Sequence, residues 1–308
     1  MASACRRGSA GQSLGPLTGP SGEITIGLQQ DGRRDFAGRI FPSMSYWSDK
    51  VAVITGGSRG LGFAIASAFA SAGARIVVAA RDPDSLARCE SELRAGGADV
   101  TTVVTDVTQA GQIERMVSHT VERYGRLDVL VNNVGHSMRG DIAATAPEVF
   151  EELMGVNFLA TVRCTHAALP HLLAARGHLV NIGSLAAKIP APHLGAYPAT
   201  KFAVAGYTHQ LRLELEPRGL HVLLVCPGPI LHPQGSSRYD HMTAGLPDAA
   251  RQPGGTRQLK PIPPAHVAKK ILRYCQRRKP ELVIPGKVRL LLAVAQLSPS
   301  LADKIIRR

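Results

Sequence analysis

Long apolar runs and paired cysteines are both missing from this chain of 308 residues. No uninterrupted apolar stretch approaches the length of about 20 residues that spans a bilayer, so we predict no transmembrane helix. The cysteines are scattered without a CxxC pair, which argues against a disulfide framework and a metal cluster and predicts free thiols (Cys5, Cys89, Cys164, Cys226 and Cys275). We therefore expect a cytoplasmic protein without a metal site. A hydrophobic content of 44% allows the core of one large α/β domain or of two small ones.

Acidic residues are scarce toward the C-terminus. Residues 251–308 contain 14 Lys and Arg against Glu281 and Asp303, a net charge of +12, whereas residues 51–250 are close to neutral. Such asymmetry indicates an anionic surface as partner, either a membrane or a nucleic acid. Because Tyr274 is the only aromatic residue of this part of the sequence, platforms for base stacking are missing, and we expect no nucleic-acid partner.

The first 46 residues are rich in Gly, Ser, Pro and Arg and show no sustained periodicity, so we predict that they are disordered. No apolar stretch follows the arginine pairs at 6–7 and 33–34, which argues against a secretory or twin-arginine signal. Met44 stands just before the first predicted strand. We interpret residues 1–43 as a mis-assigned start or a dispensable leader, with an organelle transit peptide as the alternative.

The most informative stretch is VAVITGGSRGLG, at residues 51–62. A β-branched run of a length suited to a buried strand leads into glycines at positions 56, 57, 60 and 62, and a helix-favouring segment follows at once. This order points free backbone N–H groups and the positive end of a helix dipole into one small space, which suits a phosphate. Glycine is needed because a Cβ would block both the positive-φ turn and the close approach of a pyrophosphate. The stretch therefore predicts a nucleotide site.

Strand-like and helix-like segments alternate along the chain. We predict strands at 51–55, 75–80, 100–105, 127–132, 177–184 and 221–226, with an edge strand at 282–284. Further helices are predicted at 84–95, 109–123, 147–175, 195–216, 265–278 and 287–297, with a last short helix opening at Ser298-Pro299. This alternation predicts an α/β fold: a single doubly wound, Rossmann-type parallel sheet of about seven strands with helices on both faces. The aperiodic segment 229–263 is the predicted substrate-covering loop.

Tyr197 and Lys201 lie four residues apart in YPATK, so their side chains share one face of a predicted helix. A phenol has an ordinary pKa of about 10, and a neighbouring ammonium favours the phenolate, which lowers that pKa toward the working range of an acid-base catalyst. Ser184 ends a predicted strand, where its hydroxyl and that of Tyr197 could polarise one carbonyl oxygen. Alone, these residues are compatible with a surface pair and a turn residue. Together with the glycine turn they predict an active site.

Over residues 51–230 the chain resembles the short-chain dehydrogenase/reductase family, because TGxxxGxG at 55–62 is joined by further motifs. The segment 132–135, NNVG, is similar to the family's NNAG segment, with Val in place of Ala. Pro227-Gly228 matches the turn beside the nicotinamide, and Asp106 matches the acid beside the adenine.

The resemblance also implies residue roles and a reaction, hydride transfer between a nicotinamide and a carbonyl or alcohol. Asn157, Ser184, Tyr197 and Lys201 would form the catalytic tetrad. Tyr197 would exchange the proton, Ser184 would steady the oxygen, Lys201 would hold the ribose and Asn157 would hold a water for proton relay. The cofactor would contact Gly56, Ser58, Arg59, Gly60, Leu61, Gly62, Arg81, Asp106, Val107, Asn133, Val134, Gly135, Tyr197, Lys201, Pro227, Gly228 and Ile230.

The cofactor type is predicted from charge. NAD-preferring enzymes place a carboxylate at the end of the second strand, where it binds the ribose hydroxyl. Ala80 and Arg81 stand there instead, and Arg59 lies in the glycine turn, so NADP(H) is favoured over NAD(H). The alternative is that both arginines are solvated and that Asp82, two residues beyond the end of the strand, binds the ribose. His232 also departs from the family pattern, because many members carry a threonine there that touches the carboxamide.

We predict three parts: the leader at 1–46, a catalytic domain at 47–285 and a basic amphipathic helical tail at 286–308. Apolar residues recur in the tail at helical spacing, with basic residues around them (Leu290, Val294, Leu297, Leu301 and Ile305; Lys287, Arg289, Lys304, Arg307 and Arg308). Such helices can lie in a membrane interface, so we predict peripheral membrane contact through 287–308. A dimer or core stripe with solvated charge is the alternative.

The function predicted on these grounds is an NADP(H)-dependent oxidoreductase that acts on a small carbonyl or alcohol of apolar or lipid-like character. The helices at 147–175 and 195–216 could pair across a two-fold axis, so a homodimer or homotetramer is expected. The alternatives are a non-catalytic dinucleotide-binding or regulatory module, and a membrane or partner scaffold that uses the tail. The intact set of Ser184, Tyr197 and Lys201 argues against the non-catalytic module.

Overall fold

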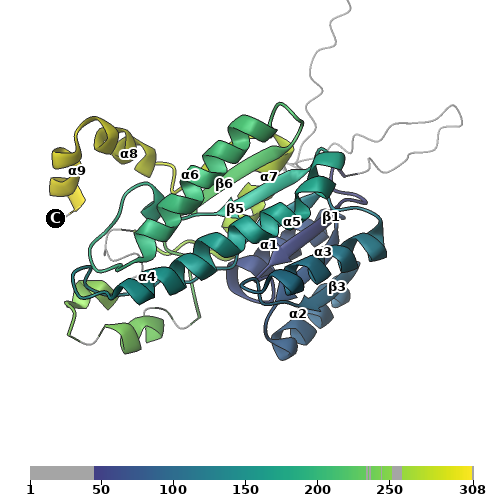
Figure 1. Cartoon of the computed structure of the whole chain (residues 1–308), viewed down its shortest axis with the longest axis horizontal. Coiled ribbons are helices and arrows are strands. Elements are labelled where there is room, and N and C mark those ends of the chain that lie inside the picture. Colours follow the sequence, from purple (N-terminus) through teal and green to yellow (C-terminus); the bar gives the residue numbers. More distant parts are fainter. Residues whose placement is uncertain (1–44, 234, 236, 244, 252–258, 307–308) are drawn as a thin grey trace, which may run out of the picture. The chain divides into compact units, whose positions relative to one another are not determined.

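The computed structural model describes residues 45–233, 235, 237–243, 245–251 and 259–306, and all but the last two residues of the predicted leader lie outside them. A seven-stranded, all-parallel sheet in the order β3-β2-β1-β4-β5-β6-β7 forms the centre of this part of the chain (Figure 1). Its strands are β1 Val51–Thr55, β2 Arg75–Ala80, β3 Val100–Val104, β4 Val129–Asn132, β5 His178–Ile182, β6 His221–Pro227 and β7 Glu281–Ile284. The predicted doubly wound Rossmann-type fold is thereby confirmed.

Helices alternate with the strands as expected. They are α1 Gly60–Ser71, α2 Pro83–Ala95, α3 Ala110–Tyr124, α4 Pro147–Met154, α5 Ala160–Ala174, α6 Tyr197–Leu215, α7 Pro264–Gln276, α8 Val288–Leu297 and α9 Pro299–Ile306. Most boundaries lie within about two residues of the predicted ones, which is the usual uncertainty of element ends.

Alternation along the strands divides the core between the two faces of the sheet. On β1, Ala52 and Ile54 pack with buried residues of α1, α2 and α7, whereas Val51 and Val53 pack with those of α3, α5 and α6. Successive strand residues point to opposite faces, so a run of apolar residues serves both helical layers. The sheet is therefore rigidly held, and the carboxyl ends of its strands form a fixed edge on which ligand-binding loops stand.

Two predicted elements differ in detail. The single helix expected at 147–175 is interrupted by a π-helical turn, Gly155–Leu159, between α4 and α5. The segment 229–263 contains two short 3-10 turns, Ser237–Met242 and Asp248–Arg251, and a one-residue bridge that joins Ile230 to Ile262. Its described residues are thus partly ordered by local turns that carry no helix or strand periodicity in the sequence.

The C-terminal helix α8 begins inside the catalytic unit. Val288, its first residue, is buried in a core cluster with Leu185, Val204 and Val283. Farther along, Leu290, Leu297 and, on α9, Leu301 are exposed. Within the described residues, the structure contains no helix with the length and apolar character needed to cross a bilayer.

Candidate active site

The loop between β1 and α1 has the backbone that an anion site requires. Gly56 and Gly60 adopt φ values of +61° and +58°, which other residues rarely adopt. A Cβ on Gly62 would meet the Gly56 carbonyl oxygen at 2.2 Å and the Asn133 side-chain nitrogen at 2.6 Å, so only glycine allows this close approach. Arg59 is the N-cap of α1 and makes no side-chain hydrogen bond to its first amides, which leaves these N–H groups for a bound anion.

Asn133 fixes the glycine loop to the end of β4. Its Nδ2 donates to the carbonyl oxygens of Thr55 and Gly56, both at 3.1 Å, and its backbone N–H donates to Thr55 Oγ1 at 3.1 Å. Thr55 Oγ1 in turn donates to the Val131 carbonyl oxygen at 3.2 Å. Because the strand order reverses between β1 and β4, these bonds hold the crevice at the switch point of the sheet, where nucleotides bind in such folds.

The predicted adenine and ribose side lies at the ends of β2 and β3. Asp106 Oδ1 accepts hydrogen bonds from the N–H and the hydroxyl of Thr108, at 2.9 and 2.8 Å, and the backbone bond holds the pKa of Asp106 below its ordinary value. Arg59 and Arg81 are exposed and line the same cavity as Asp106. Asp82 caps α2 by accepting a backbone hydrogen bond at 3.1 Å.

Ser184, Tyr197 and Lys201 meet beyond the end of β5. The Ser184 hydroxyl caps the 3-10 turn Leu185–Ala187 and interacts with the Tyr197 phenol. Tyr197 is the first residue of α6, and Lys201 follows one turn later with its Nζ 5.9 Å from the centre of the Tyr197 ring. Lys201 Nζ donates to the Ile182 carbonyl oxygen at 2.9 Å. The strand end and the helix start thus bring the three predicted catalytic side chains together.

Burial governs the proton affinity of this group. It raises the pKa of Tyr197 to about 12, although the Ser184 hydroxyl and the Arg139 charge act in the opposite direction. It also lowers the pKa of the buried Lys201 to about 8. The expectation that Lys201 brings the phenol toward neutral pH is therefore wrong for the protein's own residues, because desolvation of the phenolate is the larger effect. With this pKa, Tyr197 keeps its proton across the neutral range.

Asn157 lies in the π-helical turn, fully buried behind the cavity. Its Oδ1 accepts from the His136 N–H at 2.9 Å, while its Nδ2 donates to the His136 carbonyl oxygen at 2.9 Å and to Thr200 Oγ1 at 3.0 Å. Asn157 thereby ties the loop after β4 to the helix that carries Tyr197 and Lys201. π-helical turns are frequent at functional sites, but no sequence pattern had signalled this one.

One cavity of about 950 Å³ brings the other predicted residues together. Ser184 lines it together with every predicted cofactor residue, namely Gly56, Ser58, Arg59, Gly60, Leu61, Gly62, Arg81, Asp106, Val107, Asn133, Val134, Gly135, Tyr197, Lys201, Pro227, Gly228 and Ile230. His232, which departs from the family pattern, lines it too. This volume lies at the upper end of the range of small-molecule and cofactor sites.

Comparison with known proteins decides the family. The family model described as short chain dehydrogenase matches residues 50–242, well over half of the chain. The chain belongs to the short-chain dehydrogenase/reductase family. It is an oxidoreductase of that family, and the resemblance that the motifs indicated is confirmed.

Among its relatives, dehydrogenase/reductase SDR family member 7B of Bos taurus is 33% identical over 273 residues, 85% of this chain and 82% of the relative. L-fucose dehydrogenase of Mus musculus is 37% identical over 192 residues, 62% of this chain and 69% of the relative.

Solved structures of other short-chain dehydrogenase/reductases resemble the chain as well. A single-residue variant of actinorhodin polyketide ketoreductase with NADPH has a TM-score of 0.68 at 31% identity and covers 77% of this chain and 96% of its own. A short-chain dehydrogenase/reductase from Burkholderia phymatum in complex with NAD has a TM-score of 0.72 at 26% identity and covers 83% and 95%. Members of similar structure therefore bind either cofactor.

Arg139 and Tyr239 form a part of this short-chain dehydrogenase/reductase site that sequence reasoning missed. Arg139 is buried, donates from Nε to the Ala250 carbonyl oxygen at 2.8 Å, and places its guanidinium 3.7 Å from the centre of the Tyr239 ring. The Tyr239 hydroxyl lies 3.2 Å from Ser137 Oγ. The described residues around Tyr239 and Ala250 in segment 229–263 thus contact the loop after β4. No pattern in the sequence indicates this contact, because Arg139 and Tyr239 lie far apart along the chain.

Much of the remaining cavity wall is apolar, although His136, Ser137, Arg139, Glu152 and Tyr239 line the cavity too. It is lined by Ile189, Pro190, Ala191, Pro192 and Leu194 from the segment before α6, by Leu231, Met242 and Leu259 from segment 229–263, and by Val288 and Leu291 from α8. The tail therefore contributes to the site wall, which the division at residue 286 did not anticipate.

Proposed function

We propose that this short-chain dehydrogenase/reductase interconverts a carbonyl and an alcohol on a small apolar substrate, with NADP(H) preferred over NAD(H). The observation that carries the proposal is the shared cavity: a glycine cradle for phosphates lies at one end, and Ser184, Tyr197 and Lys201 lie together at the other. A non-catalytic binding module would have no need of these three side chains in contact with one space.

The residues present fit a dinucleotide. The space that a Cβ of Gly62 would fill and the positive φ of Gly56 are the features that let a backbone approach a pyrophosphate. We assign the pyrophosphate to this loop, the adenine to Asp106 and Val107, and the ribose beside the nicotinamide to Lys201 and Tyr197. When bound, the nicotinamide would supply or accept the hydride.

The proton is assigned to Tyr197. Its raised pKa keeps the phenol protonated near pH 7, so its O–H can donate to a substrate oxygen while the Ser184 hydroxyl donates a second hydrogen bond. We place Asn157 on the proton path because a Cβ on Gly135 would lie 2.9 Å from Asn157 Oδ1 and 3.4 Å from Lys201 Nζ. These two polar atoms thus flank one small space, in which Asn157 is placed to hold a water.

Replacing Tyr197 tests the reaction. In Tyr197→Phe the proton donor is lost and the cavity shape is kept, so we expect turnover of a ketone panel with NADPH to fall at least about 100-fold, the lower bound for loss of a positioned acid. Tyr274→Phe, on α7 outside this cavity, is the matched control and should be unchanged. Equal activity of Tyr197→Phe and the wild type would remove the assignment.

The NADP(H) preference rests on Arg59 and Arg81, which line the cavity at the end where the 2′-phosphate would lie, and on the use of Asp82 as a helix cap. Two guanidinium groups favour a phosphate, and one charged hydrogen bond contributes about 1.5–3 kcal/mol. In Arg81→Ala we therefore expect the Kd for NADPH to rise about 10- to 100-fold while that for NADH stays within about twofold. Arg218→Ala, an exposed arginine outside the cavity, is the control. Equal losses for both cofactors would contradict the preference.

An apolar or lipid-like substrate is supported by the wall around Tyr197, where Ile189, Leu194 and Leu291 line the cavity. Burial of apolar substrate area against such a wall contributes about 25 cal/mol of favourable free energy per Å². Within a series of linear ketones, we expect kcat/KM to rise with chain length until the cavity is filled. A preference for short polyols over these ketones would contradict the assignment.

A homodimer or homotetramer is supported by exposed apolar side chains around α5 and α6, namely Leu159, Phe202 and Leu213. Exposed apolar groups on neighbouring helices are typical of an interface. Sedimentation velocity should show an oligomer that Phe202→Glu combined with Leu213→Glu converts to a monomer. A wild-type monomer would refute this part of the proposal.

Peripheral membrane contact is supported by the exposed Leu290, Leu297 and Leu301 beside basic residues of α8 and α9; Arg307 and Arg308 lie outside the described residues. Because Val288 and Leu291 line the cavity, point variants test this better than removal of the tail. We expect co-sedimentation with anionic vesicles, lost in Leu297→Glu combined with Leu301→Glu and weakened by salt. Unchanged binding of the double variant would exclude the tail as the contact.

A further inference from the structure

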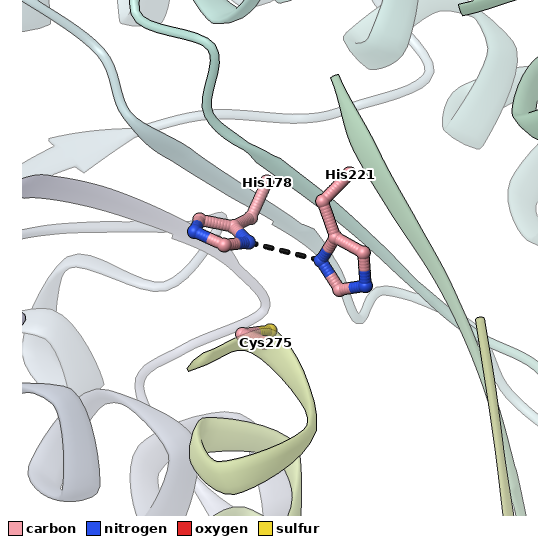
Figure 2. A group of neighbouring side chains, drawn as sticks. All are labelled: His178, His221 and Cys275. Carbon is pink, nitrogen blue, oxygen red and sulfur yellow. Dashed lines mark hydrogen bonds between the residues drawn. The ribbon is translucent and has the colours of Figure 1, made fainter. Parts of the chain in front are cut away.

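A second cluster of ligand-type side chains lies at the opposite, amino edge of the sheet (Figure 2). His178 begins β5, His221 begins β6, and Cys275 stands near the end of α7. All three are buried, and their ligand atoms lie within 4.8 Å of one another. The absence of a CxxC pair had predicted no metal site. A search for CxxC pairs does not find this cluster, because its members are 43 and 54 positions apart in the sequence.

One of the hydrogen bonds around the two imidazoles, that of His221 to a backbone carbonyl, has a fixed direction. The Nδ1 atoms face each other at 2.9 Å, His221 Nε2 lies 2.9 Å from the Lys279 carbonyl oxygen, and His178 Nε2 lies 2.8 Å from the Tyr46 hydroxyl. A carbonyl only accepts, so His221 carries its proton on Nε2 and presents a lone pair on Nδ1. Metal-binding histidines hold their outer N–H on a carbonyl in the same way.

His178 can adopt two hydrogen-bonding states that differ in which of its ring nitrogens carries the proton. In the hydrogen-bonded state its Nδ1–H donates to His221, and the Tyr46 hydroxyl donates to its Nε2. When the proton moves to Nε2, this nitrogen donates to the Tyr46 oxygen instead, and the Tyr46 hydrogen turns to solvent, since that residue is 44% exposed. Both Nδ1 atoms then carry a lone pair at the gap between the two rings, and the Cys275 sulfur lies to one side of this gap in Figure 2.

Charge and ligand number select the ion. One thiolate and two neutral imidazoles balance the charge of a monovalent ion, whereas a dication would leave a net positive charge buried, which is costly. One thiolate and imidazoles suit Cu⁺, while structural Zn²⁺ sites take four ligands. Among the described residues, this cluster offers three.

We propose that His178, His221 and Cys275 form a three-coordinate structural site for Cu⁺. On binding, a Cu–S bond forms, the S–H bond of Cys275 breaks, and one proton passes to the buffer. Copper remains in the +1 state, so no oxidant or reductant takes part. The ion would join β5, β6 and α7 at the edge opposite the cavity and would stabilise the fold without contacting the proposed hydride-transfer site.

Competition with a Cu⁺ chelator under anaerobic conditions tests the proposal on the full chain. We expect one ion per chain, release of one proton per ion, and an affinity that falls about 10-fold in Tyr46→Phe, which keeps the ring and removes the group that holds His178. In Cys275→Ser a ligand is removed, so the affinity for Cu⁺ should fall by more than about 100-fold, beyond the range for residues that only support a ligand. Cys164→Ser, a buried thiol on α5, and Cys5→Ser are controls that should bind as the wild type does.

Several results would overturn the site. These are no bound ion, equal retention by Cys275→Ser, or one equivalent of Zn²⁺ bound in preference to Cu⁺. If Cys275→Ser fails to fold, as judged by thermal unfolding and NADPH binding, X-ray absorption of the loaded wild type decides. One sulfur and two nitrogen neighbours support the site, and any other ligand set refutes it.

Discussion

The two edges of the parallel sheet bury polar side chains in opposite ways. At the amino edge, Asp128 is fully buried but paired, because it accepts a hydrogen bond from the Val51 N–H at 3.0 Å and lies 2.6 Å from the Arg126 guanidinium. At the carboxyl edge, the Lys201 ammonium is buried at a cost that appears as a pKa lowered to about 8. The first arrangement stabilises the fold, and the second holds a charge that the fold alone would not favour.

Function and stability are therefore expected to depend on opposite edges of the sheet. Residues at the carboxyl edge should be replaceable with loss of activity and little loss of stability, or even a gain. Residues at the amino edge should behave in the reverse way.

Gly62→Ala should abolish most cofactor binding. The added Cβ would meet the Gly56 carbonyl oxygen at 2.2 Å, so the turn must move out of the position that receives the pyrophosphate. Overpacking of this kind costs about 1–3 kcal/mol and sometimes more, so we expect the Kd for NADPH to rise about 100-fold. Gly206→Ala, on α6 with open space around the added Cβ, is the control. Unchanged NADPH binding in Gly62→Ala would break the assignment of the glycine loop.

His221→Ala should lower the free energy of unfolding by about 2–3 kcal/mol in metal-free buffer. The change opens a cavity and leaves the buried Nδ1 of His178 and the Lys279 carbonyl oxygen without their partner. Denaturant unfolding measures the loss, and kcat/KM at a temperature well below unfolding should stay within about twofold of the wild type, because the residue is at the far edge of the sheet. A large loss of kcat in a folded variant would show that the two edges are not independent.

Lys201→Met should stabilise the protein while it removes activity. The pKa of Lys201 falls from 10.5 to about 8 on folding, which corresponds to a cost of about 3 kcal/mol below pH 8. The variant removes this cost but also loses the hydrogen bond to the Ile182 carbonyl, which contributes about 1 kcal/mol. We therefore expect a net stabilisation of about 1–2 kcal/mol at pH 7.

The sign of the pH dependence follows from the same shift. Between about pH 8 and 10.5 the folded protein releases the Lys201 proton while the unfolded chain retains it, so the wild type recovers stability as pH rises. The advantage of Lys201→Met should therefore shrink over this window. A constant difference from pH 7 to pH 10 would show that the ammonium is not buried at a cost.

Arg139→Lys should give the smallest effect. Lysine keeps the positive charge but loses the Nε bond to Ala250 and the planar stack on Tyr239, which weakens the docking of segment 229–263. We expect KM for the ketone to rise about 3- to 10-fold, or about 1 kcal/mol, with kcat and its pH profile nearly unchanged. Arg218→Lys is the control. A shifted pH profile at constant KM would instead mean that Arg139 acts on the Tyr197 proton.

Much of the fold and of the site could be predicted from the sequence because the signals are local. The strand, glycine turn and helix at 51–71 follow from side-chain size and periodicity within one segment, and Tyr197 and Lys201 share a face because a helix has 3.6 residues per turn. The π-helical turn around Asn157 and the 3-10 turns of segment 229–263 have no such local signature, so they were missed.

Near neighbours along the chain are enough to set the alternation of strands and helices, the glycine cradle and the identity of the residues at the carboxyl edge. How these parts interact depends on packing between distant segments. It set the pKa of Tyr197 by burial against the effect expected of Lys201, and it joined Arg139 to Tyr239. It also brought His178, His221 and Cys275 together, because desolvation and long-range contact arise from packing between segments and leave no pattern in any one of them.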